Sequence, residues 1–126
     1  MTDAAPKPTP SDDRPDGLLA WQLDLYPGNH TRRNTLLLHA VSSPMFCLGC
    51  IALVVAPFTT PWIALAAVEI PLALVVQGAT HKQEPTPPVP FRSPLDFVAR
   101  FFAEQWITFP RFVLGGGFAR AWRAAR

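Results

Sequence analysis

The sequence predicts an all-α membrane protein, in which an antiparallel transmembrane helical hairpin is joined by amphipathic interfacial helices. Three observations support this fold class. Between Arg33 and Lys82 only Glu69 is charged, and the stretch is long enough for two membrane-crossing helices. A short turn, PFTTP, divides it near its middle. Further on, residues 94–109 combine many aromatic side chains with evenly spaced charges, which is typical of a helix lying in the membrane interface.

The two transmembrane helices are expected at about residues 34–56 and 61–81. Each segment has the ~20 residues that an α-helix needs to cross ~30 Å of hydrocarbon. Helices are the expected form because backbone polar groups in lipid must be hydrogen-bonded internally. The turn between the segments is too short for anything other than an antiparallel return.

The rest of the chain is arranged around this hairpin. Residues 1–16 are proline-rich, acidic and free of aromatic side chains, which predicts a disordered tail. Residues 17–114 are expected to form a single membrane domain. Its first segment, closed by a Pro-Gly-Asn turn, is expected on the membrane surface with Trp21 and Tyr26 at headgroup depth. Residues 115–126 are expected to be a flexible glycine joint and a basic tail.

The interfacial helix has recognisable ends. Ser93 is expected to cap its N-terminus, with a proline at the first helical position. Asp96, Arg100 and Glu104 follow at a spacing of four and form one polar edge. Pro110 is expected to end the helix, because proline cannot continue the backbone hydrogen bonding.

The flanking charges predict an orientation. Arg32, Arg33 and Lys82 lie at the open end of the hairpin, together with both chain ends, whereas the turn is uncharged. The positive-inside rule therefore places both termini in the cytoplasm, in a bacterial inner membrane or an equivalent endomembrane. Residues 82–126 carry seven basic and three acidic side chains, which indicates the lipid bilayer as a partner and not nucleic acid.

Polar residues inside the hairpin are expected at helix contacts. The first transmembrane helix carries a polar stripe that is expected to face the second, and Pro44 is expected to kink it. Glu69 is costly in lipid, so we expect it at a contact with another helix or subunit, which leaves a homo-oligomer through the transmembrane helices open. The stripe consists of His39, Ser42, Ser43, Phe46 and Cys50.

Few other motifs carry chemistry. Cys47 and Cys50 form a CxxC pair without a second pair, and we interpret them as buried small apolar residues. The glycine run at residues 115–117 follows no strand pattern and precedes no Lys-Ser or Lys-Thr, so it does not predict a phosphate-binding loop.

All three histidines are expected at one end of the hairpin. His39 lies 20 residues before Thr59 in the turn and His81 lies 22 residues after it. At ~1.5 Å per residue both are ~30 Å from the tip, and His30 precedes the first helix by a few residues. Three imidazoles suit iron, zinc, copper or nickel and leave positions open for water, oxygen or substrate. The set predicts a metal site, and interfacial histidines that cap the hairpin are the alternative.

Two further residues are candidates to support such a site. Glu84 follows His81 by three residues and is a candidate fourth ligand, or a hydrogen-bond partner of a ligand. Gln77 precedes His81 by four residues and is a candidate to orient its ring.

The order and spacing of these residues match a known pattern: Tyr26, His30, Asn34, His39, Pro44, Gln77 and His81. Over roughly residues 21–114 the chain resembles the DUF962 family of small membrane proteins, which includes the fungal 2-hydroxy fatty acid dioxygenase. The resemblance rests on the nine-residue spacing of the first two histidines, the proline five residues after the second, and the Gln-xxx-His motif.

The resemblance implies an iron(II)-dependent enzyme of fatty acid α-oxidation, which removes one carbon from a 2-hydroxy acyl chain with molecular oxygen. The implied iron ligands are His30, His39 and His81. The residues implied to surround them are Tyr26, Asn34, Gln77 and Glu84. The alternative is a non-enzymatic membrane scaffold, or a partner subunit whose polar end only packs the hairpin.

Overall fold

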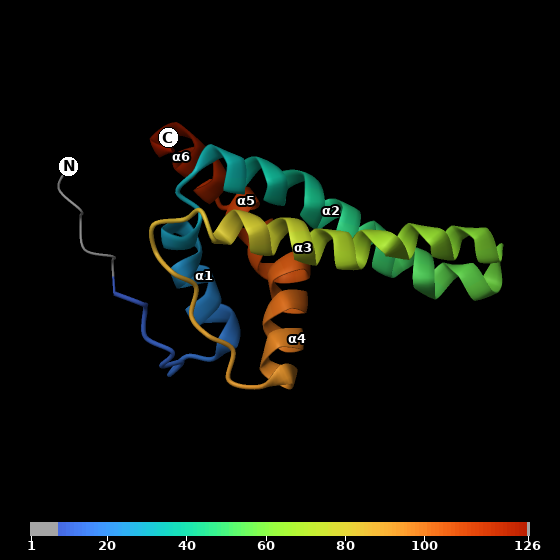
Figure 1. Ribbon diagram of the computed structural model, residues 1–126, viewed down its shortest axis with the longest axis horizontal. Coiled ribbons are helices and arrows are strands. Elements are labelled where there is room, and N and C mark those ends of the chain that lie inside the picture. The colour runs from blue at the N-terminus through green and yellow to red at the C-terminus, as the bar shows by residue number, and fades with distance from the viewer. Residues whose placement is uncertain (1–7, 126) are drawn as a thin grey trace.

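The computed structural model describes residues 8–125, and every regular element in that range is helical. A long hairpin extends to one side, and four shorter helices gather at its open end (Figure 1). The hairpin consists of α2 (Arg33–Val55), the 3₁₀ segments η1 (Ala56–Phe58) and η2 (Pro61–Val68), and α3 (Glu69–His81). The other elements are α1 (Leu18–Asn29), α4 (Pro94–Ala103), the π-helical segment η3 (Glu104–Thr108), α5 (Phe109–Leu114) and α6 (Gly117–Ala124).

The two limbs of the hairpin agree with the predicted transmembrane helices. Arg33–Phe58 and Pro61–His81 are each long and apolar enough to cross a membrane. They run side by side in opposite directions (Figure 1). Their outward faces leave large apolar side chains uncovered, such as Phe58 at 85% and Trp62 at 76% exposure near the tip. Apolar surface on this scale needs a covering phase, and the two limbs have the dimensions for lipid.

The limbs pack closely at Gly49. A Cβ atom added there would lie 3.0 Å from the carbonyl oxygen of Ala66 and 3.4 Å from the Cβ of Glu69. Small residues permit this approach of two helices in a membrane. Glu69 therefore lies at the contact between the limbs, which agrees with the expected helix contact for this residue.

The hydrophobic core lies at the open end of the hairpin. Leu36 of α2 is fully buried there against the aromatic rings of Tyr26, Phe109 and Phe112. These residues come from α1, α2 and α5, so the core joins the hairpin to the short helices. The far half of the hairpin takes no part in it.

The interfacial helix begins as predicted but does not end at Pro110. Ser93 Oγ accepts a hydrogen bond from the Asp96 amide at 3.1 Å, which confirms the cap. Helix α4 then continues through η3 and α5 to Leu114. Pro110 stands two residues after the wider π-helical turn, where the missing N–H and the bulk of the ring are tolerated more easily than in a regular α-helix.

Two expectations about surface position are wrong. Trp21 and Tyr26 were expected at headgroup depth, but both are buried within the protein, at 8% and 3% exposure. The guanidinium of Arg14 covers the Trp21 ring at 4.1 Å, and the Trp21 indole donates to the Ser11 carbonyl at 3.0 Å. Pro27 does not start a turn, because it lies within α1.

The expected C-terminal tail is largely a helix. Gly116 adopts a left-handed conformation with φ of 79°, which turns the chain between α5 and α6. Gly117 lies against Phe112 so closely that an added Cβ would meet its ring at 2.5 Å. The Arg33 guanidinium lies 5.3 Å from the Trp122 ring centroid, so α6 is attached to the start of α2.

The expected disordered tail falls partly outside the described residues, since residues 1–7 are not among them. From residue 8 to residue 16 the chain has no regular secondary structure, but its charges are paired. Arg14 Nη1 lies 2.7 Å from Asp96 Oδ1, and Arg92 Nε lies 2.8 Å from Asp12 Oδ2. These ion pairs hold this part of the segment against the start of α4.

We expect Gly49→Ala to destabilise the protein by about 1–3 kcal/mol, because the new methyl group meets backbone in a packed contact. Gly78→Ala is the matched control, since nothing lies within 4 Å of a Cβ added there. It should be neutral or stabilise by up to ~1 kcal/mol through helix propensity. Thermal unfolding in neutral detergent measures both, and equal effects of the two substitutions would contradict the close packing.

We expect the fold to weaken in acid through Asp96. The hydrogen bond from Arg14 lowers the pKa of Asp96 well below its ordinary value, against the opposing effect of burial. A lowered carboxyl pKa stabilises the folded state above the unfolded pKa, and this stabilisation disappears as pH falls through the folded value. The melting temperature of the wild type should therefore fall below about pH 4, and that of Asp96→Asn should be lower at pH 7 and less sensitive to acid. Parallel melting curves would contradict this.

Candidate metal centre

The three histidines of the chain meet at the open end of the hairpin. His30 follows α1, His39 lies in the second turn of α2, and His81 ends α3. Their ring centroids are separated by 4.5 Å (His30–His39), 4.9 Å (His30–His81) and 5.0 Å (His39–His81). The hairpin geometry predicted this convergence, and metal binding by the three residues stays a prediction.

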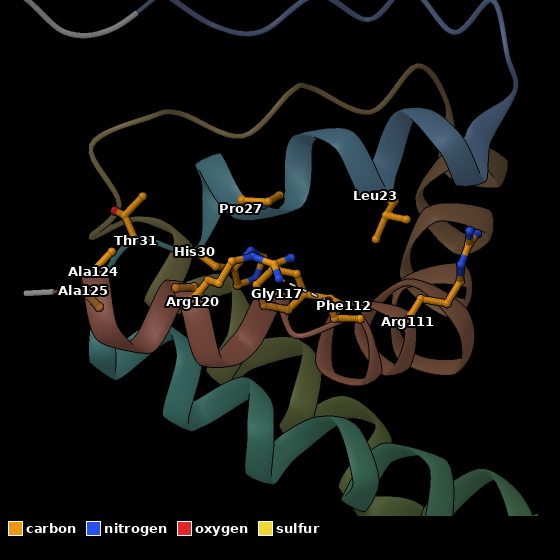
Figure 2. A pocket seen from close by; sticks show the side chains of 12 residues that line it. Leu23, Pro27, His30, Thr31, Arg111, Phe112, Gly117, Arg120, Ala124 and Ala125 are labelled. Atoms are coloured by element: carbon orange, nitrogen blue, oxygen red, sulfur yellow. Dashed lines mark hydrogen bonds between the residues drawn. The ribbon is translucent and has the colours of Figure 1, made fainter.

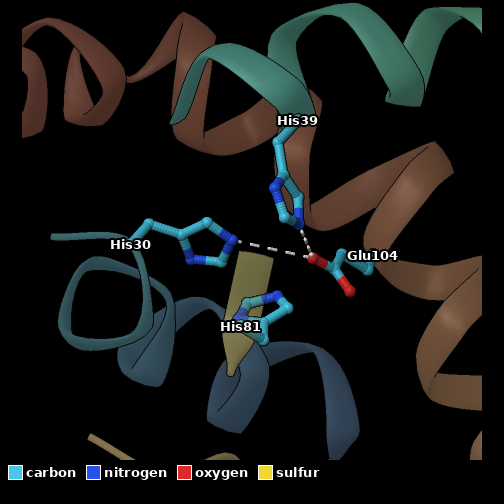
Figure 3. Close-up of side chains that lie close together, drawn as sticks. All are labelled: His30, His39, His81 and Glu104. Atoms are coloured by element: carbon cyan, nitrogen blue, oxygen red, sulfur yellow. Dashed lines mark ion pairs between the residues drawn. The ribbon is translucent and has the colours of Figure 1, made fainter. Parts of the chain in front are cut away.

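A carboxylate completes the cluster. Glu104, the first residue of η3, reaches between the imidazoles (Figure 3), with Oε1 at 3.4 Å from His39 Nε2 and 3.9 Å from His30 Nε2. One ligand atom from each of these four residues lies within 4.8 Å of the others. The set of three imidazoles and one carboxylate is able to hold a metal ion.

Glu104 was not predicted as part of the site. The sequence placed it on a polar edge with Asp96 and Arg100, and the structure turns this edge toward the protein. Arg100 donates to the Val89 carbonyl at 3.0 Å, and Asp96 pairs with Arg14. The one sequence feature that could have indicated this role is that Glu104 is an ionisable residue between the aromatic residues Phe102 and Trp106.

Glu84 does not take the position of a fourth ligand. Its carboxylate accepts hydrogen bonds from the backbone amides of Thr31 and Arg32, each at 3.1 Å. These amides stand just before α2, where helix N–H groups have no partner within the helix. Burial raises the pKa of Glu84, but the hydrogen bonds from Thr31 and Arg32 outweigh it and lower the pKa overall. Glu84 therefore fastens the start of the hairpin.

Two of the histidines have a defined tautomer. His30 Nδ1 lies 2.8 Å from the Tyr26 carbonyl oxygen, and His39 Nδ1 lies 2.8 Å from that of Thr35. A carbonyl oxygen only accepts hydrogen bonds, so both Nδ1 atoms carry a hydrogen. In the neutral ring the lone pair is then on Nε2, and both Nε2 atoms face Glu104. This is the orientation in which a backbone carbonyl prepares a histidine for a metal.

The atoms at the centre of the cluster lack hydrogen-bond partners among the described residues. The Nε2 atoms of His30 and His39 and Oε1 of Glu104 are buried, and none has a hydrogen-bond partner among the described residues. Three acceptors that face one another repel, and a buried carboxylate needs a compensating charge. A cation bound between them would satisfy all three at once, so the observed atoms fit a divalent metal.

The electrostatics favour the forms that bind metal. Burial lowers the pKa of His30, and charges on His39 and His81 lower it further, so its imidazole is neutral near pH 7. Burial raises the pKa of Glu104, but the histidines around it, His39 first, lower it to about 2. Burial thus favours the neutral imidazole of His30, and positive charge from a histidine or a bound cation favours the ionised carboxylate of Glu104. These are the ligating species.

Of the other predicted residues, Tyr26 contacts the cluster, whereas Asn34 and Gln77 do not orient its ligands. Tyr26 stacks on His30 with ring centroids 3.8 Å apart, and so fixes the plane of that ring. Asn34 is exposed on the first turn of α2 and takes no part in the cluster. Gln77 does not orient His81, because its amide is bonded elsewhere: to Ser42 Oγ at 2.9 Å and to the amide of Gln105.

Below the cluster, a buried amide pair joins three helices. Gln77 and Gln105 exchange two hydrogen bonds, of 2.9 and 2.7 Å, and Ser43 donates to Gln105 at 2.6 Å. The polar stripe of α2 therefore faces η3 as well as α3, whereas it was expected to face only the second limb. Cys47 also points to this junction, 3.6 Å from the Gln105 carbonyl. It is half-buried and free, as Cys50 is, and not fully buried as expected.

The cluster has its own opening. A cavity of about 110 Å³ is lined by three of the four candidate ligands, His30, His81 and Glu104. Its other walls are mostly apolar and come from α1, α4 and the segment around Val89. We call it the access chamber. Its volume admits a few water molecules or a small polar group, since one water requires ~10–15 Å³ on this measure.

The chain is thus an all-helical protein with two helices that could cross a membrane and a His/Glu group that could hold a metal ion. No protein-family model matches it, and no curated protein or solved structure matches it either.

We expect Glu104→Gln to weaken metal binding at least tenfold, because it removes the only carboxylate among the four candidate ligands. Glu84→Gln should keep the affinity and lower only the thermal stability. Titration of the purified protein with cobalt(II), followed by its visible absorption, measures both variants. Loss of binding in Glu84→Gln alone would contradict the assignment of Glu104.

Proposed function

We propose that this chain is an integral membrane metalloprotein in which His30, His39, His81 and Glu104 bind a divalent metal, iron(II). The observation that carries the proposal is the meeting of unpartnered acceptor atoms from three separate segments. Histidines with one carboxylate and open positions are the ligands that non-haem iron(II) oxygenases use. The donor set fits zinc as well, so the identity of the metal belongs to the test.

The membrane placement follows from the surface of the hairpin. Both limbs have apolar outer faces, and the described ends of the chain lie together at the open end (Figure 1). We propose that the limbs cross the bilayer and that both termini are cytoplasmic, since Arg32, Arg33 and Lys82 also lie at this end. The metal centre then stands at the level of the lipid headgroups.

The reaction we propose, as the resemblance to the DUF962 family implies, is oxidation of a 2-hydroxy fatty acid by molecular oxygen. The bond between C1 and C2 breaks, C2 becomes the carboxyl carbon of the shortened acid, and C1 leaves as carbon dioxide with one molecule of water. Bound iron(II) would supply activation of oxygen and Lewis acidity toward the substrate. The chain itself contributes three things. Tyr26 and the backbone carbonyls hold two imidazoles in place, the amide pair below fixes η3, and the small access chamber keeps bulk water from the centre. A polar head fits this chamber, while an acyl chain must remain outside it.

A structural role is the second candidate. The distance of 3.4 Å between His39 Nε2 and Glu104 Oε1 also suits an ion pair with a protonated His39. In that case the cluster would only pack four helices, and the protein would be a scaffold or a partner subunit. The presence of a stoichiometric metal separates the two candidates.

We expect the protein purified without oxygen and reconstituted with iron(II) to hold about one iron per chain, and His39→Ala to hold none. Cells that express the wild type and are fed a 2-hydroxy fatty acid should produce the acid one carbon shorter. Glu69→Gln is the control, because it removes a hairpin carboxylate outside the cluster, and it should leave both results unchanged. Absence of iron with an unchanged lipid profile in His39→Ala would leave only the structural role.

A further inference from the structure

A second and larger cavity lies beside the metal centre. It has a volume of about 600 Å³, is lined by α1, α5 and α6, and is open to the surface on one side (Figure 2). Among the described residues, His30 is the only one that lines both this cavity and the access chamber. At 2% exposure the His30 side chain closes the wall between the two, so this cavity is separate from the metal centre.

The walls of the cavity are apolar. Leu23 and Pro27 of α1 form one side, and Phe112 of α5 and Ala121 of α6 form another. Alanines continue along α6 to the end of the described chain, so that no large side chain fills the space. Its volume lies in the range of ~300–1,000 Å³ that small-molecule sites occupy.

The charged side chains that line the cavity are all positive among the described residues. Arg120 extends across its middle and Arg111 stands at one end beside Leu23 (Figure 2). Among the described residues no acidic side chain lines it. Arg120 donates only to the Gly115 carbonyl, at 3.3 Å, which leaves most of its five N–H donors free, and Arg111 has no ion pair within residues 8–125.

The position of the cavity favours a ligand that comes from the membrane surface. Thr31 lines it, two residues before α2 begins the first candidate span. A molecule bound there is therefore in reach of the membrane surface. Apolar walls with a guanidinium over them are complementary to an amphiphile with an anionic head.

We propose that this cavity binds a single-chain anionic amphiphile, a fatty acid, with its carboxylate on Arg120 and its chain against Leu23, Pro27 and Phe112. A volume of about 600 Å³ accommodates one acyl chain but not a two-chain phospholipid. Arg111 adds positive potential at the far end. The site needs no metal, and only its place at the membrane surface rests on the proposed function.

The test uses palmitic acid that carries a photoactivatable diazirine, added to the full-length protein in phosphatidylcholine nanodiscs. We expect cross-links on peptides of α1 and α6, displaced by unlabelled palmitic acid and not by hexadecanol of the same length. Arg120→Gln should reduce the labelling about tenfold, since it removes a charge-assisted hydrogen bond. Arg123→Gln is the matched control, because Arg123 lies on the same helix, bonds to the Ala119 carbonyl and does not line the cavity.

A second variant tests the space itself. Ala121→Phe should reduce labelling without any change of charge, and circular dichroism shows whether it folds. Equal labelling of wild type and Arg120→Gln, equal displacement by hexadecanol, or labels confined to the outer faces of α2 and α3 would overturn the proposal. The same labelling with a metal chelator present keeps this outcome distinct from that of the metal centre.

Discussion

The carboxylate of Glu104, whose Oε1 is buried, is the constraint on which the open end of this protein depends. Apolar side chains cannot solvate it, so a charge must be supplied from its surroundings. Three segments deliver imidazoles to it, and they belong to α1, α2 and α3. The carboxylate itself comes from a fourth segment, η3. Four parts of the chain that are distant in sequence therefore meet at one point, where a cation would attract all of them, and the small hydrophobic core beside them holds this arrangement.

The elements predicted correctly from the sequence are those that depend on the length of an apolar stretch and on the regular geometry of a helix. The bounds of the hairpin follow from an uninterrupted apolar stretch, and the common level of His39 and His81 follows from the rise per residue. The choice between Glu84 and Glu104 could not be made in this way. It depends on how the continuous helix formed by α4, η3 and α5 crosses the hairpin. Until that crossing is known, the sequence offers no reason to prefer either carboxylate as a partner of His81.

The other incorrect predictions also arise from contacts between helices that the sequence does not show. Trp21 and Tyr26 have the composition of interfacial anchors, yet the arginines and histidine beside them make a protein contact that is more favourable than the headgroup region. Pro110 would end a regular α-helix, but the π-helical turn that ends two residues before it accommodates the ring. Such a turn also moves the side chains that follow it, and η3 carries both Glu104 and Gln105. The irregular segment thus supplies the carboxylate of the cluster and the amide that fixes it from below.

The shared wall at His30 connects the two cavities physically. Its Nε2 faces Glu104, its Nδ1 is bonded to the Tyr26 carbonyl, and its ring is held by stacking on Tyr26. A ligand in the larger cavity would contact the opposite side of this residue and of α1, without displacing any metal ligand. These contacts hold the ring in one orientation. The wall at His30 therefore separates the two sites, so that each is able to bind its ligand without the other.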